Sequence, residues 1–250
     1  MSIPPILQKI VQEKYSEIAQ IPEYSEFSRK TYSLKQSILG KKTAIIAECK
    51  KGSPSAGILK ADYFSKKIAL EYERFGAAGI SVLTDRKFFY GSISDLEDVS
   101  SSVGIPVLRK DFIIDELQIR EARYFGASAF LLIARILEKK KLRSLLEFGK
   151  KIGLECLVEI HTKEEAADAL DSGAEIIGIN SRDLDTFQIN NSLIPEIAEY
   201  LPDHIVRVGE SGVHGKEDLL KMGKRINAYL IGTYFMESEN LSESFHALMN

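Results

Sequence analysis

Short apolar runs alternate with longer amphipathic stretches from residue 44 almost to the end of the chain. Each apolar run leads into polar residues, a loop and then apolar positions at helical spacing, which is typical of a strand followed by a helix. The pattern predicts strands over residues 44–49, 79–84, 105–110, 129–133, 154–159, 175–180, 205–209 and 228–232. It predicts helices over 63–75, 115–125, 138–151, 163–172 and 216–223, with weaker helical patterns over 92–102 and 191–200.

The junctions before several predicted strands resemble one another. Residues 75–80, 125–130 and 172–176 each carry a Gly-Ala or Gly-Ala-Ser type of turn, where Gly suits the left-handed end of a helix. Strands alternating with helices over roughly 200 residues favour an α/β fold, the (β/α)8 TIM barrel. The alternative is an open doubly wound sheet, but neither GxGxxG nor GxxxxGK[ST] occurs in the chain.

Residues 1–40 have a helical pattern without strands. A stripe that follows Pro4-Pro5 has apolar residues at helical spacing, namely Ile6, Leu7, Ile10, Val11 and Ile18. A second helix is predicted over about residues 25–39 and ends at Gly40. Because no linker-like stretch divides the chain, we expect one barrel domain over residues 1–250, with residues 1–40 as an N-terminal helical extension packed on it.

Composition narrows the class of protein. The 36 acidic and 33 Lys and Arg residues give a net charge of −3, so we expect neither nucleic acid nor an anionic membrane as a partner. There is no apolar run of membrane-spanning length and no secretory signal pattern at the N-terminus. The two cysteines, Cys49 and Cys156, lie inside predicted strands and form no CxxC pair. These features predict a reducing, cytoplasmic location and no metal site built on sulfur.

Polar residues follow the predicted strands, where a TIM barrel has its active site. Glu48 and Lys50 lie at i and i+2 on one face of the first strand, and a Gly-Ser-Pro-Ser-Ala-Gly loop comes next. Burying several charges in a barrel mouth is costly unless they pair, so the set favours a working site. The alternative is a structural ring of ion pairs that closes the top of the barrel.

Two of these residues suit acid–base chemistry. Lys110 ends the third strand, and two carboxylates across the mouth would make it a candidate general acid; its alternative is a solvated lysine. Glu159 ends the fifth strand and is a candidate general base; its alternative is a carboxylate that merely pairs with Lys50 or Lys110. His161 follows closely, but a lone histidine is more often structural, so it is left out of the catalytic set.

The loops after the last two strands suit a phosphate group. Gly209–Gly212 and Ile231–Thr233 provide glycines where a backbone can approach an anion, and Ser53 and Lys50 reach from the first strand. The chain has no HxH, HExxH or acidic triplet that would indicate a metal. Strand alternation turns Cys49 away from Glu48, which argues against a thiol nucleophile.

With these motifs the chain resembles the indole-3-glycerol phosphate synthase family of tryptophan biosynthesis. The resemblance covers nearly the whole chain, including the N-terminal extension. The motifs at the first and third strands are the most specific. In chain order the matching segments are residues 46–50 with 53–55, 82–85 with 88–92, 108–113, 157–159, 179–184 and 209–213.

The resemblance implies a lyase that converts 1-(2-carboxyphenylamino)-1-deoxyribulose 5-phosphate to indole-3-glycerol phosphate with loss of CO₂ and water. It implies no cofactor and no metal, a small phosphorylated substrate as the partner, and a monomer, with association with other tryptophan-pathway enzymes left open. By position, Lys110 would be the general acid at the substrate ketone and Glu159 the general base in the dehydration. Glu48 and Lys50 would form the charged pair that positions them.

The remaining site residues are also carried over from the family by position. The residues expected beside the intermediate are Asn180, Glu210 and Ser211. Those expected to hold the phosphate are Ser53, Gly212, Gly232 and Thr233. Those expected near the aromatic ring are Phe112, Leu184 and Arg182. The chain departs from the family pattern at Thr233–Phe235, where the family usually has a small or acidic residue followed by Leu; this puts the side-chain part of the phosphate contact in question.

Two other functions fit parts of the pattern. A sugar-phosphate isomerase such as phosphoribosylanthranilate isomerase would need a Cys or Asp pair at the strand ends, and the predicted direction of Cys49 disfavours it. A barrel that binds a phosphorylated metabolite without turnover would be expected to have lost charged residues at the strand ends, and none is lost here.

Overall fold

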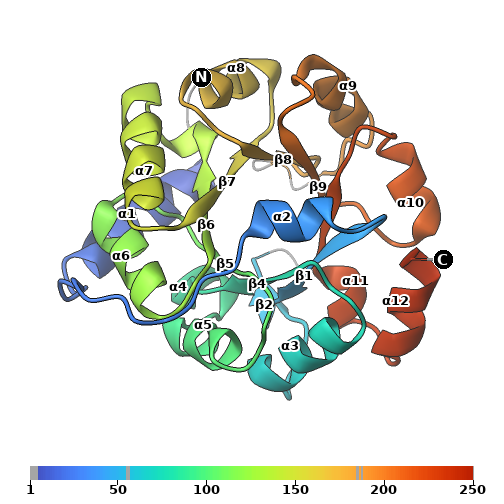
Figure 1. Ribbon diagram of the computed structural model, residues 1–250, viewed down its shortest axis with the longest axis horizontal. Helices are drawn as coiled ribbons and strands as arrows, with labels where there is room; N and C mark the ends of the chain where they lie inside the picture. The colour runs from blue at the N-terminus through green and yellow to red at the C-terminus, as the bar shows by residue number, and fades with distance from the viewer. Residues whose placement is uncertain (1–4, 55–56, 184–185, 187, 250) are drawn as a thin grey trace.

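A closed barrel of parallel strands forms the centre of the computed structural model, which describes residues 5–54, 57–183, 186 and 188–249. The strands are β1 (Ala44–Cys49), β4 (Gly79–Leu83), β5 (Val107–Lys110), β6 (Ala129–Ile133), β7 (Glu155–Ile160), β8 (Ile176–Asn180), β9 (Val206–Glu210) and β10 (Ala228–Ile231). Each strand pairs with the next in this order, and β10 pairs with β1 to close the ring (Figure 1). The predicted TIM barrel is confirmed.

Helices surround the barrel (Figure 1). They are α3 (Ser65–Arg74), α5 (Ile93–Ser100), α6 (Glu116–Tyr124), α7 (Lys139–Lys151), α8 (Lys163–Asp171), α9 (Leu193–Tyr200), α10 (Lys216–Lys221) and α12 (Leu241–Met249). The shorter elements are the hairpin of β2 (Gly52–Ser53) and β3 (Gly57–Ile58), α4 (Arg86–Phe89), the 3-10 turn η1 (Ala134–Ile136) and α11 (Thr233–Met236). The helices α4, η1, α11 and α12 were not predicted from the sequence pattern.

Alternation along the strands divides the apolar residues into two cores. Ile46, Leu108 and Leu157 belong to the cluster that fills the barrel. Their neighbours Ile45 and Val158 belong to the cluster between the strands and the outer helices. Because successive strand residues face opposite sides, the inward positions that reach the ends of the strands are free to carry polar groups.

The N-terminal extension contacts both ends of the barrel. In α1 (Pro5–Ile18), Lys14 forms ion pairs with Asp85 and Asp111, which follow the carboxyl ends of β4 and β5. The helix α2 (Leu34–Leu39) lies across the end nearest the viewer in Figure 1, where Ser37 Oγ donates a hydrogen bond to the carbonyl of Ala78, just before β4. The extension therefore runs from the mouth of the barrel to its opposite end.

The predicted helix over residues 25–39 is wrong for its first part, because the helix here is α2, Leu34–Leu39. The preceding residues are held by side-chain contacts with the outer helices instead of by helical hydrogen bonds. Tyr24 stacks on Tyr124 with ring centroids 4.2 Å apart, and Arg29 forms an ion pair with Glu97. The Ser33 hydroxyl accepts a hydrogen bond from the Gln36 N–H and so fixes the N-terminus of α2.

Strand boundaries differ slightly from the prediction. The predicted strand over residues 105–110 begins only at Val107 in the structure, since Pro106 has no N–H to donate to a neighbouring strand. The strand predicted over 205–209 is Val206–Glu210, so Glu210 is part of β9 rather than of the following loop. Within the described residues, no helix is long and apolar enough to cross a membrane.

Candidate active site

A cavity of about 430 Å³ lies at the carboxyl ends of the strands. Among the residues that line it are those expected at the site: Glu48, Lys50, Ser53, Lys110, Phe112, Glu159, Asn180, Arg182, Glu210, Ser211, Gly212, Gly232 and Thr233. Leu184, also expected there, lies outside the described residues, as do residues 55 and 56 of the first loop. The strand ends thus bring together side chains that are far apart in the sequence.

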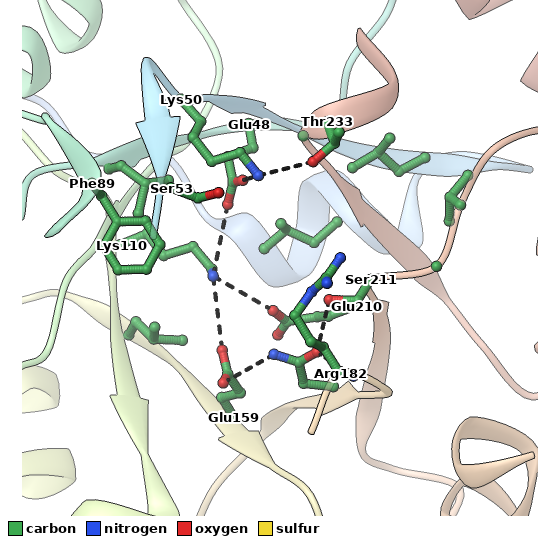
Figure 2. Close-up of a pocket in the computed structure, with 18 of the residues that line it drawn as sticks. Glu48, Lys50, Ser53, Phe89, Lys110, Glu159, Arg182, Glu210, Ser211 and Thr233 are labelled. Atoms are coloured by element: carbon green, nitrogen blue, oxygen red, sulfur yellow. Dashed lines mark hydrogen bonds and ion pairs between the residues drawn. The ribbon is translucent and has the colours of Figure 1, made fainter. Parts of the chain in front are cut away.

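Lys110 occupies the centre of the charged group (Figure 2). Its Nζ lies 3.7 Å from Glu48 Oε2, 3.8 Å from Glu159 Oε2 and 4.0 Å from Glu210 Oε2. Two carboxylates were expected around this lysine, and the structure brings in a third, Glu210, the last residue of β9. A single ammonium group therefore faces three buried carboxyl groups.

The charges in this group alter one another's ionisation. Burial opposes the charged form of Lys110, but Glu48 and Glu159 outweigh it and raise the pKa of Lys110 above its ordinary value. Burial likewise opposes the charged form of Glu48, but Lys50 and Lys110 lower the pKa of its carboxyl. At neutral pH Lys110 is consequently an ammonium and Glu48 a carboxylate, so Lys110 carries a proton that it can donate.

Glu210 differs from the other two carboxyl groups. Burial first, and then the negative charge of Glu159, raise its pKa well above the ordinary range. Within the described residues, its Oε1 has no hydrogen-bond partner. A buried carboxyl beside another carboxylate favours the neutral form, so Glu210 can serve as a hydrogen-bond donor in the cavity.

A second lysine connects the charged group to the end of β10. Lys50 Nζ lies 3.3 Å from Glu48 Oε1 and donates a hydrogen bond of 3.1 Å to Thr233 Oγ1 (Figure 2). The backbone of Gly232 passes so close that a Cβ there would overlap Glu48 Oε1. Glycine at this position therefore leaves room for the Glu48 carboxylate between its two lysines.

Asn180 is held in one orientation by its neighbours. Its Nδ2 donates to Glu159 Oε1 at 3.2 Å, while its Oδ1 accepts from the Ser211 hydroxyl at 2.8 Å and from the Arg182 N–H at 3.0 Å. Ser211 adopts a left-handed backbone with φ 69°, which is unfavourable for a residue other than glycine. In this conformation its hydroxyl reaches Asn180.

The residues expected at the phosphate lie along one side of the cavity. Ser53 comes from β2, Gly212 follows β9, and Gly232 directly precedes the short helix α11, which begins with Thr233. Backbone N–H groups at such a turn are suited to an anion, and Lys50 adds a positive charge beside them. In the described part of the chain, no group of three or more His, Cys, Asp or Glu side chains is arranged to hold a metal.

Several lining residues were missed by the sequence analysis as site residues. Leu131 and Ile133, at i and i+2 of β6, form an apolar part of the wall, and Phe89 faces Phe112 with ring centroids 5.9 Å apart. The alternation of β6 was a usable signal, since the inward positions of that strand are predicted to be 129, 131 and 133. An apolar wall of this kind suits an aromatic ring.

Three residues near the strand ends face other partners. Cys49 is fully buried on the helix side of β1, with its Sγ 3.9 Å from the Ser65 carbonyl, as the alternation predicted. Arg109 points outward and pairs with Glu121 at 2.8 Å. Asp111 lines the cavity, but Lys14 and Arg109 outweigh its burial and lower its pKa to about 2. The structural ion-pair alternative therefore holds for Arg109 and Asp111.

Solved structures with the same fold are distant in sequence. A protein titled KGPDC from Streptococcus mutans superposes with a TM-score of 0.64 at 14% identity, covering 83% of this chain and 96% of that chain. At this identity the likeness concerns the fold alone.

Curated proteins match far more closely. The chain is 52% identical over 240 residues to the indole-3-glycerol phosphate synthase of Leptospira interrogans, covering 96% of this chain and 95% of that protein. It is 42% identical over 244 residues to the one from Aquifex aeolicus, covering 94% and 95%. The model of the family described as indole-3-glycerol phosphate synthase matches residues 7–248. The chain that builds this cavity belongs to the indole-3-glycerol phosphate synthase family.

Proposed function

We propose that this protein converts 1-(2-carboxyphenylamino)-1-deoxyribulose 5-phosphate to indole-3-glycerol phosphate, CO₂ and water. The observation that carries the proposal is the position of Lys110, a charged ammonium among Glu48, Glu159 and Glu210 that also faces the cavity. We infer the substrate from membership in the family, and the cavity contains a candidate group for each step of the reaction.

Ring closure needs an acid at the ketone. As the aromatic carbon that carries the carboxylate attacks the ketone carbon, the ketone oxygen gains negative charge and takes a proton from Lys110. CO₂ then leaves from the same aromatic carbon, and its bonding electrons restore the aromatic ring. The carboxylates around Lys110 stabilise the ammonium before the step, so the proton is delivered to an oxygen that becomes basic only as the bond forms.

Dehydration needs a base and a departing hydroxyl. Glu159 takes a proton from a carbon of the new five-membered ring, and the departing hydroxyl takes up a proton from solvent and leaves as water, which completes the indole. Glu159 Oε2 lies on the side of Lys110, within the cavity. Asn180 and Ser211 orient the intermediate through the hydrogen-bond network around Asn180, and Glu210 adds its carboxyl from the cavity wall.

The substrate carries a phosphate at one end and a carboxylate at the other, and a different set of cavity residues binds each group. Lys50 with Ser53, Gly212, Gly232 and Thr233 binds the phosphate. Arg182 faces the cavity from the end of β8 and suits the carboxylate of the ring, while Phe112 and the apolar wall contact the ring itself. On this proposal, residues 1–250 form one domain, and the protein acts as a monomer in the cytoplasm. It can also associate with other enzymes of the same pathway.

A direct assay tests the proposal. Purified protein incubated with the carboxyphenylamino substrate is expected to produce indole absorbance and fluorescence together with one CO₂ per indole. Isothermal calorimetry under the same conditions distinguishes binding from turnover. If heat of binding is seen without indole formation at saturating substrate, the protein is a metabolite-binding barrel and not an enzyme. If the substrate ketone is converted to its N-ribosyl isomer without release of CO₂, the protein is an isomerase.

A further inference from the structure

His161 lies directly behind Glu159, between two carboxyl groups. It follows β7 and is 6% exposed. Its Nε2 is 3.4 Å from Glu159 Oε1, and its Nδ1 is 3.4 Å from Glu165 Oε2. Within the described residues neither ring nitrogen satisfies hydrogen-bond geometry, so each nitrogen of this buried imidazole lies near a carboxylate oxygen without a hydrogen bond to it. Such an arrangement is costly unless it serves the groups that it faces.

The outer carboxylate of this pair is fixed by the surrounding structure. Glu165 is in the first turn of α8, where its backbone N–H donates to the Thr162 hydroxyl at 3.2 Å. Its Oε2 accepts a 2.6 Å hydrogen bond from the backbone N–H of His161, and its Oε1 accepts a 2.8 Å hydrogen bond from Arg135 Nε, which comes from η1. The imidazole therefore has a rigid support on the side away from the cavity.

The two oxygens of Glu159 have different neighbours. Oε1 accepts from Asn180 and faces His161, whereas Oε2 faces Lys110 at 3.8 Å. Figure 2 shows the Glu159 side chain directed toward Lys110. Because a carboxylate rotates about its last bond, groups that hold Oε1 determine where Oε2 points.

We propose that His161 is a positioning residue, which holds Glu159 Oε1 on the side away from the cavity so that Oε2 is presented to the substrate. The row Arg135, Glu165, His161, Glu159 and Lys110 then runs from the helix layer to the cavity with a polar contact at every step. The inference rests on the proposed function, since it assigns Oε2 of Glu159 as the atom that takes the proton. The 3.4 Å separation shortens to a hydrogen bond when substrate is bound, as polar contacts at a catalytic base commonly do.

A pair of variants separates positioning from packing. His161→Phe fills the same space without an N–H, and His161→Gln keeps an N–H donor. We expect His161→Phe to lower kcat by about 10²-fold with KM within about twofold, because a small misplacement of a catalytic group costs this much. His161→Gln should regain a large part of the loss. His246→Phe, at an exposed histidine of α12, is the matched control and should retain full kcat.

A double-mutant cycle tests whether His161 acts through Glu159. In a Glu159→Gln background, adding His161→Phe should lower kcat no further, because the group that His161 positions is already removed. An equal loss in both backgrounds, or wild-type kcat in His161→Phe, would overturn the inference. Glu165→Gln is a second variant, which leaves the His161 ring unaltered, and it should lower kcat with an unchanged KM. If His161→Phe fails to fold, wild-type kcat in Glu165→Gln would also overturn the inference.

A crystal structure of His161→Phe gives a result that is independent of turnover. The Glu159 carboxylate should rotate so that neither oxygen remains near Lys110 as in the wild type. An unchanged Glu159 would contradict the positioning role even in an active enzyme. If the wild-type protein itself makes no indole, the proposed function fails, while the rotation of Glu159 still decides what His161 does.

Discussion

The Nζ of Lys14 lies 2.9 Å from Oδ1 of Asp111, which joins the N-terminal helix α1 to the residue next to Lys110. The same ammonium is 2.7 Å from Asp85 Oδ2, and all three side chains are almost completely buried. Burial opposes the charged form of Lys14, but Asp111 and Asp85 outweigh it and raise its pKa above the ordinary value. The extension is thus fastened to the mouth of the barrel by a buried cation.

Replacing Lys14 should destabilise the whole protein. Lys14→Met leaves Asp85 buried without its cation and leaves Asp111 with Arg109 alone, and loss of one partner of a buried ion pair costs roughly 3–5 kcal/mol. Urea unfolding at pH 7 measures the loss. The matched control is Lys87→Met, which breaks the exposed pair between Lys87 of α4 and Glu13 of α1 and should cost about 0–1 kcal/mol. Equal small losses in both variants would show that the buried cluster contributes no more than a surface pair.

Lys110→Ala should abolish turnover and leave the protein folded. General acid catalysis commonly contributes about 10²–10⁴-fold, so kcat is expected to fall at least into this range. Indole fluorescence measures turnover, and circular dichroism checks the fold. Lys151→Ala, at an exposed lysine of α7, is the control and should turn over normally. Normal turnover in Lys110→Ala would refute its assignment as the acid.

Gly178→Ala should impair the site from within the barrel. A Cβ at position 178 would overlap Glu210 Oε1, since β8 and β9 are neighbours and Glu210 is directed across β8. The added methyl group displaces Glu210 from Lys110, so we expect a lower kcat by roughly 10-fold or more, together with reduced stability from overpacking of about 1–3 kcal/mol. Gly215→Ala, where an added Cβ meets nothing within 4 Å, should change neither quantity. Wild-type kinetics in Gly178→Ala would mean that the carboxyl of Glu210 is free to move without consequence.

Glu210→Gln should alter the pH dependence of stability. The folded-state pKa of Glu210 is raised by burial and by Glu159, so this group stabilises the fold fully only below its unfolded-state pKa near 4.5. As the pH rises above about 4.5 toward the folded-state pKa, that contribution is lost in the wild type and not in Glu210→Gln. Thermal unfolding at pH 4.5 and pH 8 should therefore show that the stability of the variant relative to the wild type is greater at pH 8 than at pH 4.5. Parallel pH profiles for the two proteins would contradict a protonated Glu210.

Local pattern was sufficient to predict most of the barrel. Strands such as Ala129–Ile133 and Ile176–Asn180 are short, apolar and bounded by turn residues, so their period and length indicate buried parallel strands without tertiary information. Residues 25–33 are the exception. Their sequence is compatible with a helix, but Arg29 pairs with Glu97 and the preceding Tyr24 stacks on Tyr124, both on outer helices. Contacts of this kind between distant segments cannot be recognised in the local pattern.

Among the residues of the site, the sequence by itself determined which charged groups stand at the ends of the strands and which of them, by motif, match a known family. Only the tertiary structure decided how those groups pair. Lys110 and Asp111 are neighbours in the chain, yet one ammonium faces three carboxyl groups in the cavity while the adjacent carboxylate is neutralised by Lys14. Strand alternation determines the side to which a residue points, but its partners come from other strands. The positions of these strands along the barrel axis are set only when the barrel closes.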